Sequence, residues 1–212
     1  VTSSGTSGRF SQGGFDWGCL LAEVPMVLRL GWRHGLISPR PAHNVILGYQ
    51  PHRQNKTGVT RTMFGLTWFA PPISRTYALR YGDGGYVPDL DQVAKALEKL
   101  GSSRFPTRII GFPSYLWFGL RAQLPKGSRI LLAGGWKQHY AQQVEKPVLY
   151  GLAGRILGIQ EANINEFFGA VEHPIFFNAC KEHHFHIPVY SRVIIRDVNT
   201  LEPLPMGKVG LI

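Results

Sequence analysis

The first residues of the chain have the composition of a loop that binds an anion. A run of hydroxyl and glycine residues precedes a cation, Arg9, and consists of Thr2-Ser3-Ser4-Gly5-Thr6-Ser7-Gly8. Glycine lets backbone N–H groups turn toward a phosphate, and the hydroxyl groups add further short donors. The run therefore predicts a phosphate-binding loop and, with it, a nucleotide. A flexible terminal tail is the alternative that composition alone leaves open.

A second group of residues combines an aromatic ring, a glycine and a carboxylate. Phe168 could stack on a flat base, Gly169 permits close approach of the backbone, and Glu172 could hold a hard divalent cation such as Mg²⁺. We expect the group on one turn that follows a strand near residues 159–164. A core phenylalanine beside a surface glutamate is the alternative.

Histidines and a cysteine gather later in the chain, within 14 positions, at His173, Cys180, His183, His184 and His186. Zinc accepts such ligands, so a Zn²⁺ site formed by His173, Cys180, His183 and His186 is one hypothesis. The spacing matches no closed zinc motif. Polar residues that line a cleft or the surface are the alternative.

The elements that must position these groups follow from hydrophobic periodicity. Apolar residues recur at helical spacing over 89–100, with Asp89 or Asp91 as the N-cap and Gly101 as the stop. Further helices are predicted over 113–120 and 138–144, and strands over 45–49, 107–111 and 129–133. Residues 20–30 predict a helix that Pro25 interrupts, and 148–157 fits helix or strand. Residues 192–212 predict a β-hairpin.

Alternation of strands and helices predicts an α/β fold with mainly parallel sheets flanked by helices. In such sheets, ligands bind at the carboxyl ends of the strands. Gly134 and Gly135 directly follow the predicted strand 129–133. We therefore expect this glycine pair at the ligand-binding edge.

These segments, in this order, resemble the adenylate-forming superfamily, which includes acyl-CoA synthetases and firefly-type luciferases. Thr2–Gly8 resembles its phosphate loop, and Phe168–Glu172 resembles its Tyr-Gly-x-Thr-Glu signature. Within the superfamily the chain is most similar to the acyl-protein synthetases of bacterial bioluminescence, the LuxE type. That likeness is carried by Thr2–Gly8, by Gly134-Gly135-Trp136-Lys137 and by Asp197–Leu211, and it covers residues 1–11 and about 89–212.

The resemblance implies ATP-dependent activation of a long-chain fatty acid as acyl-AMP, followed by transfer to a protein thiol, with an acyl-reductase complex as a partner. It implies Glu172, Thr6 and Lys137 as catalytic residues and Glu172 as the Mg²⁺ ligand. The implied nucleotide-binding residues are Ser3, Ser4, Gly5, Thr6, Ser7, Gly8, Gly134, Gly135, Trp136, Phe168 and Gly169. A phenylacetate–CoA ligase-like enzyme, which uses coenzyme A as acceptor, is the alternative within the superfamily.

The sequence also departs from the superfamily pattern. Val171 stands where a hydroxyl residue is usual, and Arg9 where lysine is common. The ribose-binding Asp, the lysine of the C-terminal domain and the acylated cysteine have no counterpart, and Cys180 does not match the last of these. We therefore expect residues 1–212 to form part of the large domain, without the small C-terminal lid domain.

Bulk composition limits the other classes of function. The net charge is +10, which suits an anionic partner. The cations are scattered and form no recognised nucleic-acid motif, so a basic nucleic-acid-binding module is the weaker alternative. Two distant cysteines predict a reduced, cytoplasmic protein, and no apolar run approaches the roughly 18–20 residues that span a bilayer.

Overall fold

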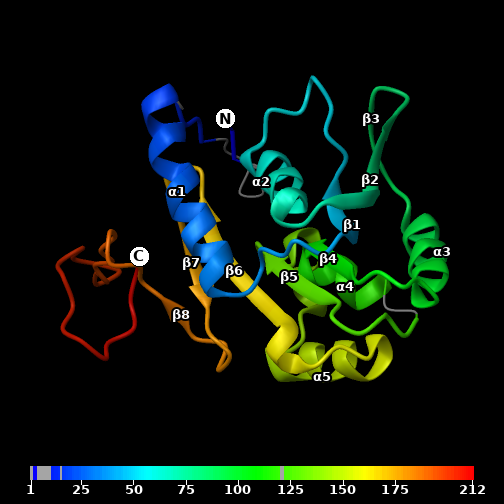
Figure 1. Cartoon of the computed structure of the whole chain (residues 1–212). Coiled ribbons are helices and arrows are strands. Elements are labelled where there is room, and N and C mark those ends of the chain that lie inside the picture. Colours follow the sequence, from blue (N-terminus) through cyan, green and yellow to red (C-terminus); the bar gives the residue numbers. More distant parts are fainter. Residues whose placement is uncertain (1, 4–10, 15, 120–121) are drawn as a thin grey trace.

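The chain folds around one eight-stranded sheet (Figure 1). The computed structural model describes residues 2–3, 11–14, 16–119 and 122–212. Strand order is β3-β2-β1-β4-β5-β6-β7-β8. Five central strands are parallel: β2 (Pro72–Gly82), β1 (Ala42–Tyr49), β4 (Thr107–Gly111), β5 (Arg129–Ala133) and β6 (Ile164–Ala170). The antiparallel strands are β3 (Gly85–Pro88), β7 (His173–Ala179) and β8 (Phe185–His186). The predicted, mainly parallel α/β fold is confirmed.

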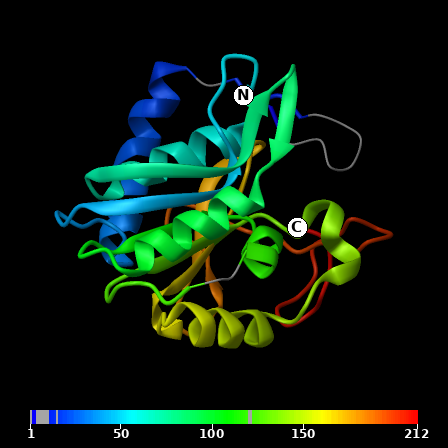
Figure 2. The ribbon, with the colours of Figure 1, turned by 90° about the vertical axis from the view of Figure 1, so that its right-hand side faces the viewer.

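Helices cover both faces of this sheet (Figures 1 and 2). One face carries α1 (Trp17–Arg33) and α2 (Gly58–Leu66). The other carries α3 (Leu90–Gly101), α4 (Pro113–Gly119) and α5 (Lys146–Leu157). Short 3₁₀ helices span Thr67–Phe69, Lys137–Gln142 and Glu161–Asn163. Because both faces are covered, the central strands are apolar and buried on both sides: Val45, Ile109 and Ile130 pair in register and are 0% exposed.

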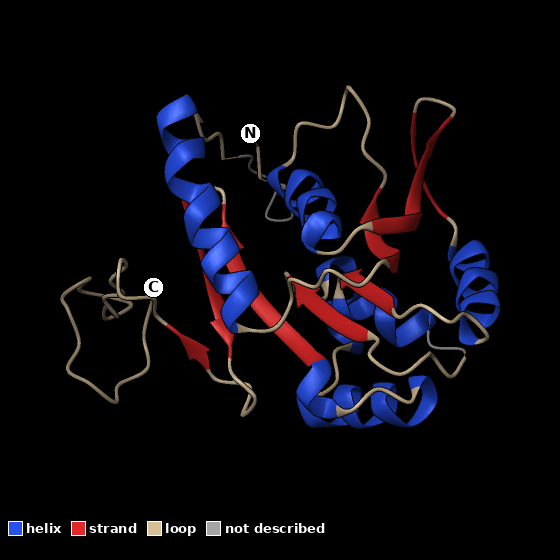
Figure 3. Ribbon diagram, viewed as in Figure 1, coloured by secondary structure: helices blue, strands red, loops and turns tan. Residues whose placement is uncertain are grey.

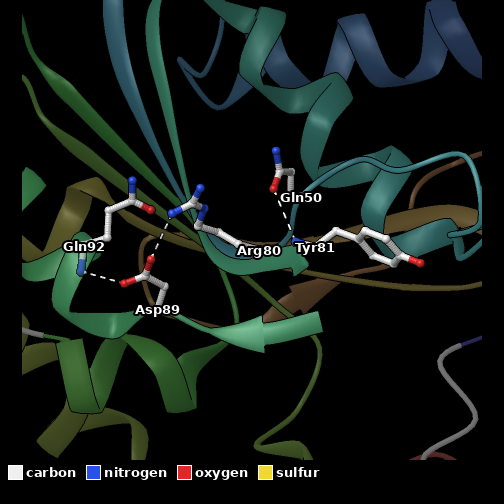
Figure 4. Close-up of polar contacts among 5 residues, drawn as sticks. All are labelled: Gln50, Arg80, Tyr81, Asp89 and Gln92. Carbon is white, nitrogen blue, oxygen red and sulfur yellow. Dashed lines mark hydrogen bonds and ion pairs between the residues drawn. The ribbon is translucent and has the colours of Figure 1, made fainter. Parts of the chain in front are cut away.

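The start of α3 is held by its predicted cap (Figure 4). The Asp89 carboxylate accepts a hydrogen bond of 3.1 Å from the Gln92 backbone N–H, which satisfies a free donor of the first turn. Its second oxygen lies 3.3 Å from Arg80 of β2. Next along that strand, the Tyr81 N–H donates to Gln50 (3.4 Å). The cap therefore also ties the helix to the neighbouring sheet.

Two predicted elements were wrong in extent. The first helix is not interrupted at Pro25: α1 runs through it, capped by Asp16, which accepts from the Cys19 N–H at 2.8 Å. Met26, Val27 and Leu30 of α1 are half-buried and pack beside β7, which holds the helix in place despite the hydrogen bond that proline removes. The strand expected near 159–164 begins only at Ile164 and extends to Ala170. A 3₁₀ helix precedes it, because residues 161–163 close a single turn.

Other element predictions agree more closely with the structure. The strands 107–111 and 129–133 have the predicted bounds. Residues 148–157, which fitted helix or strand, lie within α5, and the helix expected over 138–144 is the 3₁₀ helix Lys137–Gln142. The C-terminal hairpin is present only as isolated bridges from Arg196 to Pro203 and Leu211, and residues 187–212 are otherwise loop (Figure 3).

Gly111, the last residue of β4, offers a direct test of this packing. Its φ is +149°, and a Cβ there would lie 2.3 Å from the Leu47 carbonyl oxygen. Gly111→Ala should therefore lower the free energy of unfolding by about 3 kcal/mol or more, because backbone must move. Urea denaturation measures this. Gly151→Ala in α5, where a Cβ meets nothing within 4 Å, should instead raise stability by about 0.5–1 kcal/mol. Equal effects of the two changes would contradict the packing described.

Candidate adenylation site

A cavity of about 750 Å³ opens at the carboxyl ends of the parallel strands. Since β4, β5 and β6 are parallel, their last residues, Gly111, Ala133 and Ala170, meet at one edge of the sheet. The cavity lies between this edge, α1 and α2, where a topological rule for open α/β sheets places ligands. Its lining includes predicted site residues from three separate segments, namely Ser3, Gly134, Gly169 and Glu172.

The predicted phosphate loop is held at both ends. The Ser3 N–H donates to the Ser11 carbonyl (2.9 Å), and the Ser11 N–H donates back to the Ser3 hydroxyl (2.9 Å). Thr2 forms an antiparallel bridge with Gln12 and a parallel bridge with Thr57, just before α2. These bonds place the loop ends at the mouth of the cavity. Ser4, Gly5, Thr6, Ser7 and Gly8 lie outside the described residues.

Glu172 lies directly beside this loop. It occupies the turn between β6 and β7, is exposed, and lines the cavity mouth. A hydrogen bond from the Ser11 side chain lowers the pKa of Glu172 below its usual value. The carboxylate therefore stays ionised at neutral pH. Ser11 was not predicted from the sequence, because only folding brings it next to a residue 161 positions later.

The inner walls of the cavity are almost entirely apolar. α1 contributes Val27 and Leu30, α2 contributes Met63 and Leu66, and the sheet contributes Leu131. Glu23 also lines the wall, and burial raises the pKa of its carboxyl. Arg61 and Thr62 of α2 add polar groups. The cavity thus joins a polar mouth to a deep apolar interior. The interior wall was not foreseen, because residues 9–80 show no clean periodic pattern in the sequence.

The glycine pair after β5 lies at the expected edge. Gly134 lines the cavity with φ +72°, a conformation that glycine adopts without strain. A Cβ on Gly135 would meet nothing within 4 Å, so a ligand has room there. Trp136 corrects our expectation: it is 5% exposed, packs against Trp117 of α4 (6.3 Å between ring centroids), and does not line the cavity. Lys137 begins a 3₁₀ helix, and its side chain lies outside the described part.

Phe168 and Gly169 lie near the end of strand β6 and not on the same turn as Glu172. Alternation along the strand turns Phe167 toward the cavity and Phe168 to the opposite face. There Phe168 stacks on Phe177 of β7, with ring planes 4° apart, and remains 45% exposed. Phe168 was predicted to stack on adenine, and such stacking would need the ring face that Phe177 does not cover.

The proposed zinc group is not brought together. His173 starts β7 and Cys180 follows its end, so the strand's extended chain separates them by roughly 23 Å. His183 bonds to Glu161 (2.9 Å) and lies against the Tyr150 ring. Within the described residues no three His, Cys, Asp or Glu side chains are close enough to share a metal ion. The zinc hypothesis was wrong because strand β7 separates His173 from the other three residues of the group.

Cys180 and His186 do form a pair. The hydrogen bond from His186, with a further one from the His184 backbone, lowers the pKa of the Cys180 thiol. More of the thiol is therefore the reactive thiolate at pH 7. His186→Gln should slow alkylation of Cys180 by iodoacetamide several-fold at pH 7 and move the rate–pH midpoint upward. Mass spectrometry of the alkylated peptides measures both, with Cys19 as internal reference. Unchanged Cys180 kinetics would contradict the pairing.

Part of the chain matches a known protein family. Residues 113–212 match the model of a family described as acyl-protein synthetase, LuxE. Over these residues the LuxE resemblance is confirmed. The matched part includes Gly134, Glu172 and the C-terminal bridges, but not the phosphate loop. No curated protein matches the chain.

The fold is similar to that of the amide bond synthetase McbA from Marinactinospora thermotolerans. The TM-score is 0.54 at 14% sequence identity, over 99% of this chain and 38% of McbA. The chain thus spans well under half the length of that relative. This likeness shows the fold alone. No helix in the described part of the chain is long and apolar enough to cross a membrane.

Proposed function

We propose that the protein activates a long-chain fatty acid with ATP and passes the acyl group to a protein thiol. The observation that carries this proposal is one cavity with two chemically different ends. Its mouth holds Ser3, Gly134 and Glu172, whose residue types suit phosphates and a cation. Its interior, between α1, α2 and the sheet, is apolar. A molecule with a polar head and a hydrocarbon tail fits this arrangement.

The size of the cavity supports a long substrate. About 750 Å³ lies within the range of roughly 300–1,000 Å³ typical of small-molecule sites. Each methylene moved from water to such a wall contributes about 0.8 kcal/mol. A long acyl chain would thereby gain most of its affinity from Val27, Leu66 and Leu131 and the other apolar lining residues.

The polar residues at the mouth suit Mg²⁺ and ATP. Glu172 offers an ionised carboxylate, and Ser3 and Ser11 bring hydroxyl groups next to it, which are the hard oxygen ligands that Mg²⁺ prefers. When bound, Mg²⁺ neutralises charge on phosphate oxygens. Thr6 and the other hydroxyl residues of the loop, with their backbone N–H groups, would stabilise the charge of the departing pyrophosphate.

The proposed reaction has two balanced steps. A carboxylate oxygen of the acid attacks the α-phosphorus of ATP, so that a new O–P bond forms while the bond to the β-phosphate oxygen breaks. Pyrophosphate leaves with that electron pair. A thiolate then attacks the acyl carbon, forming a thioester, and AMP leaves. The chain's residues position the two substrates and exclude water from the mixed anhydride.

Isotope exchange tests the first step. The purified protein is incubated with ATP, Mg²⁺ and labelled pyrophosphate, with or without fatty acids of 8–18 carbons or aryl acids. We expect exchange into ATP only with long-chain acids. Exchange with none of the acids would reject the ligase function. Transfer of labelled acyl groups to coenzyme A rather than protein would establish the phenylacetate–CoA ligase-like alternative.

A further inference from the structure

Three arginines and an asparagine form a row across four neighbouring strands. Strand register pairs Arg75 of β2 with Asn44 of β1, Asn44 with Arg108 of β4, and Arg108 with Arg129 of β5. Residues paired in this way point to one face of the sheet, and adjacent members are about 4.8 Å apart. Arg75 contacts Thr67, directly after α2, which places the row on the face that carries α1 and α2.

The middle of this row is buried without partners. Arg108 is only 4% exposed, and its Nη1 has no hydrogen-bond partner. Asn44 is 0% exposed, and neither atom of its side-chain amide is hydrogen-bonded. Leaving such groups unsatisfied destabilises the folded state, and a charged group does so most. Native structures rarely tolerate this unless something else fills the site.

No carboxylate of the chain compensates this charge. All 13 Asp and Glu residues lie in the described part, and none forms an ion pair with Arg75, Arg108 or Arg129. Arg75 is partly satisfied, since its Nε donates to Thr67 (2.9 Å) and its guanidinium stacks on Phe64 and Trp68. Arg108 has no such support. Burial, with Arg129 nearby, lowers the pKa of Arg108 to about 10, so the group remains charged at neutral pH.

We propose that Asn44, Arg108 and Arg129 bind a small oxyanion, a phosphate or a carboxylate. Guanidinium groups donate in a planar fork that matches both anions, and the Asn44 amide adds a neutral donor. Two cations on adjacent strands repel each other unless a negative charge lies between them. One bound oxyanion would therefore satisfy the orphaned donors and remove the repulsion.

This site is separate from the candidate adenylation site. Arg108 and Arg129 lie near the amino ends of β4 and β5, whereas the cavity mouth lies at their carboxyl ends. The cavity lining includes none of Asn44, Arg108 or Arg129. Arg129 is only half-buried, and its Nη2 lies 3.4 Å from where a Cβ of Gly35, in the loop after α1, would stand. That loop is the route by which an anion would reach the row.

Anion titration of the purified protein tests the proposal. Unfolding temperature is measured in sodium phosphate, sulfate or acetate, with sodium chloride keeping ionic strength constant. We expect at least one oxyanion to raise the unfolding temperature by about 2–4 °C near tenfold its Kd. Arg108→Met should lose this rise, and in chloride alone it should unfold at a higher temperature than wild type, because an unpaired buried charge is gone.

Two further variants make the outcome decisive. Arg129→Gln, at the half-buried end of the row, should also lose the rise if Arg108→Met does not fold. Arg155→Met, on the exposed side of α5, should keep all of it. A rise that persists in both row variants would assign the anion to another place, such as the phosphate loop, and would overturn the proposal. The absence of any rise in wild type would overturn it as well. A preference for phosphate over acetate would distinguish the two anions.

Discussion

Replacing Glu172 by glutamine is expected to lower acid-dependent exchange of pyrophosphate into ATP by roughly 10²–10³-fold. The carboxylate lines the cavity mouth at the loop end, and its pKa is held low by the Ser11 hydroxyl. Glutamine keeps the size and the hydrogen-bonding capacity of the side chain but removes the negative charge. Exchange measured against Mg²⁺ concentration should therefore show a lower maximal rate and a higher requirement for the ion.

A matched variant separates this effect from a general loss of structure. Glu182→Gln changes an exposed glutamate in the turn after β7, at the opposite end of that strand. It should exchange at the wild-type rate. Both variants should unfold within about 1–2 °C of wild type, since exposed substitutions usually change stability by less than about 0.5 kcal/mol. Wild-type exchange by Glu172→Gln would remove the carboxylate from the proposed chemistry.

The second large effect is expected from filling the apolar cavity. Val27 lines the cavity from α1, and Val27→Phe would place a ring in space that the acyl chain is proposed to occupy. Excluding about three methylenes at about 0.8 kcal/mol each costs about 2.4 kcal/mol, or roughly 50-fold in kcat/KM for the longest acids. Short-chain acids should react as in wild type or better. Exchange across a series of chain lengths measures the shift.

α1 offers its own control for this prediction. Leu21 lies on the outer side of the same helix and is 74% exposed. Leu21→Phe introduces the same ring outside the cavity, so the chain-length preference should stay that of wild type. If both variants lower the rate equally for all acids, the apolar interior is not the acyl site, even where exchange itself depends on a carboxylic acid.

Much of the fold could be predicted from local sequence. The strands 107–111 and 129–133 are continuous apolar runs bounded by turn residues, and the sheet buries them on both faces. The cap at Asp89 follows from one side chain and the first turn of α3. In each case the sequence signal, an apolar run or a capping side chain, spans only a few residues. The bridge pattern of residues 196–211 was harder, because no neighbouring strand of the described chain extends it into a sheet.

The site was only partly predictable, for reasons of geometry. Gly134 and Glu172 could be proposed because each belongs to a segment that resembles the adenylate-forming superfamily, and both line the cavity. Composition could not tell which phenylalanine faces the cavity. Alternation along the strand turns Phe167 toward the cavity and its neighbour Phe168 away from it. The link between Ser11 and Glu172 depends on two segments that meet only in three dimensions. The same holds for the arginine row, whose members come from four strands.

Pro25 marks a point at which the helix that lines the cavity can bend. Proline has no N–H, so the Leu21 carbonyl lacks its helical donor. α1 is therefore short of one backbone hydrogen bond at this turn. Kinks in helices form at such positions. Val27 and Leu30, which line the cavity, therefore lie beyond a point at which a helix can bend. Under the proposed function, a bend at this point would change the room for the acyl tail without moving the first turns of the same helix.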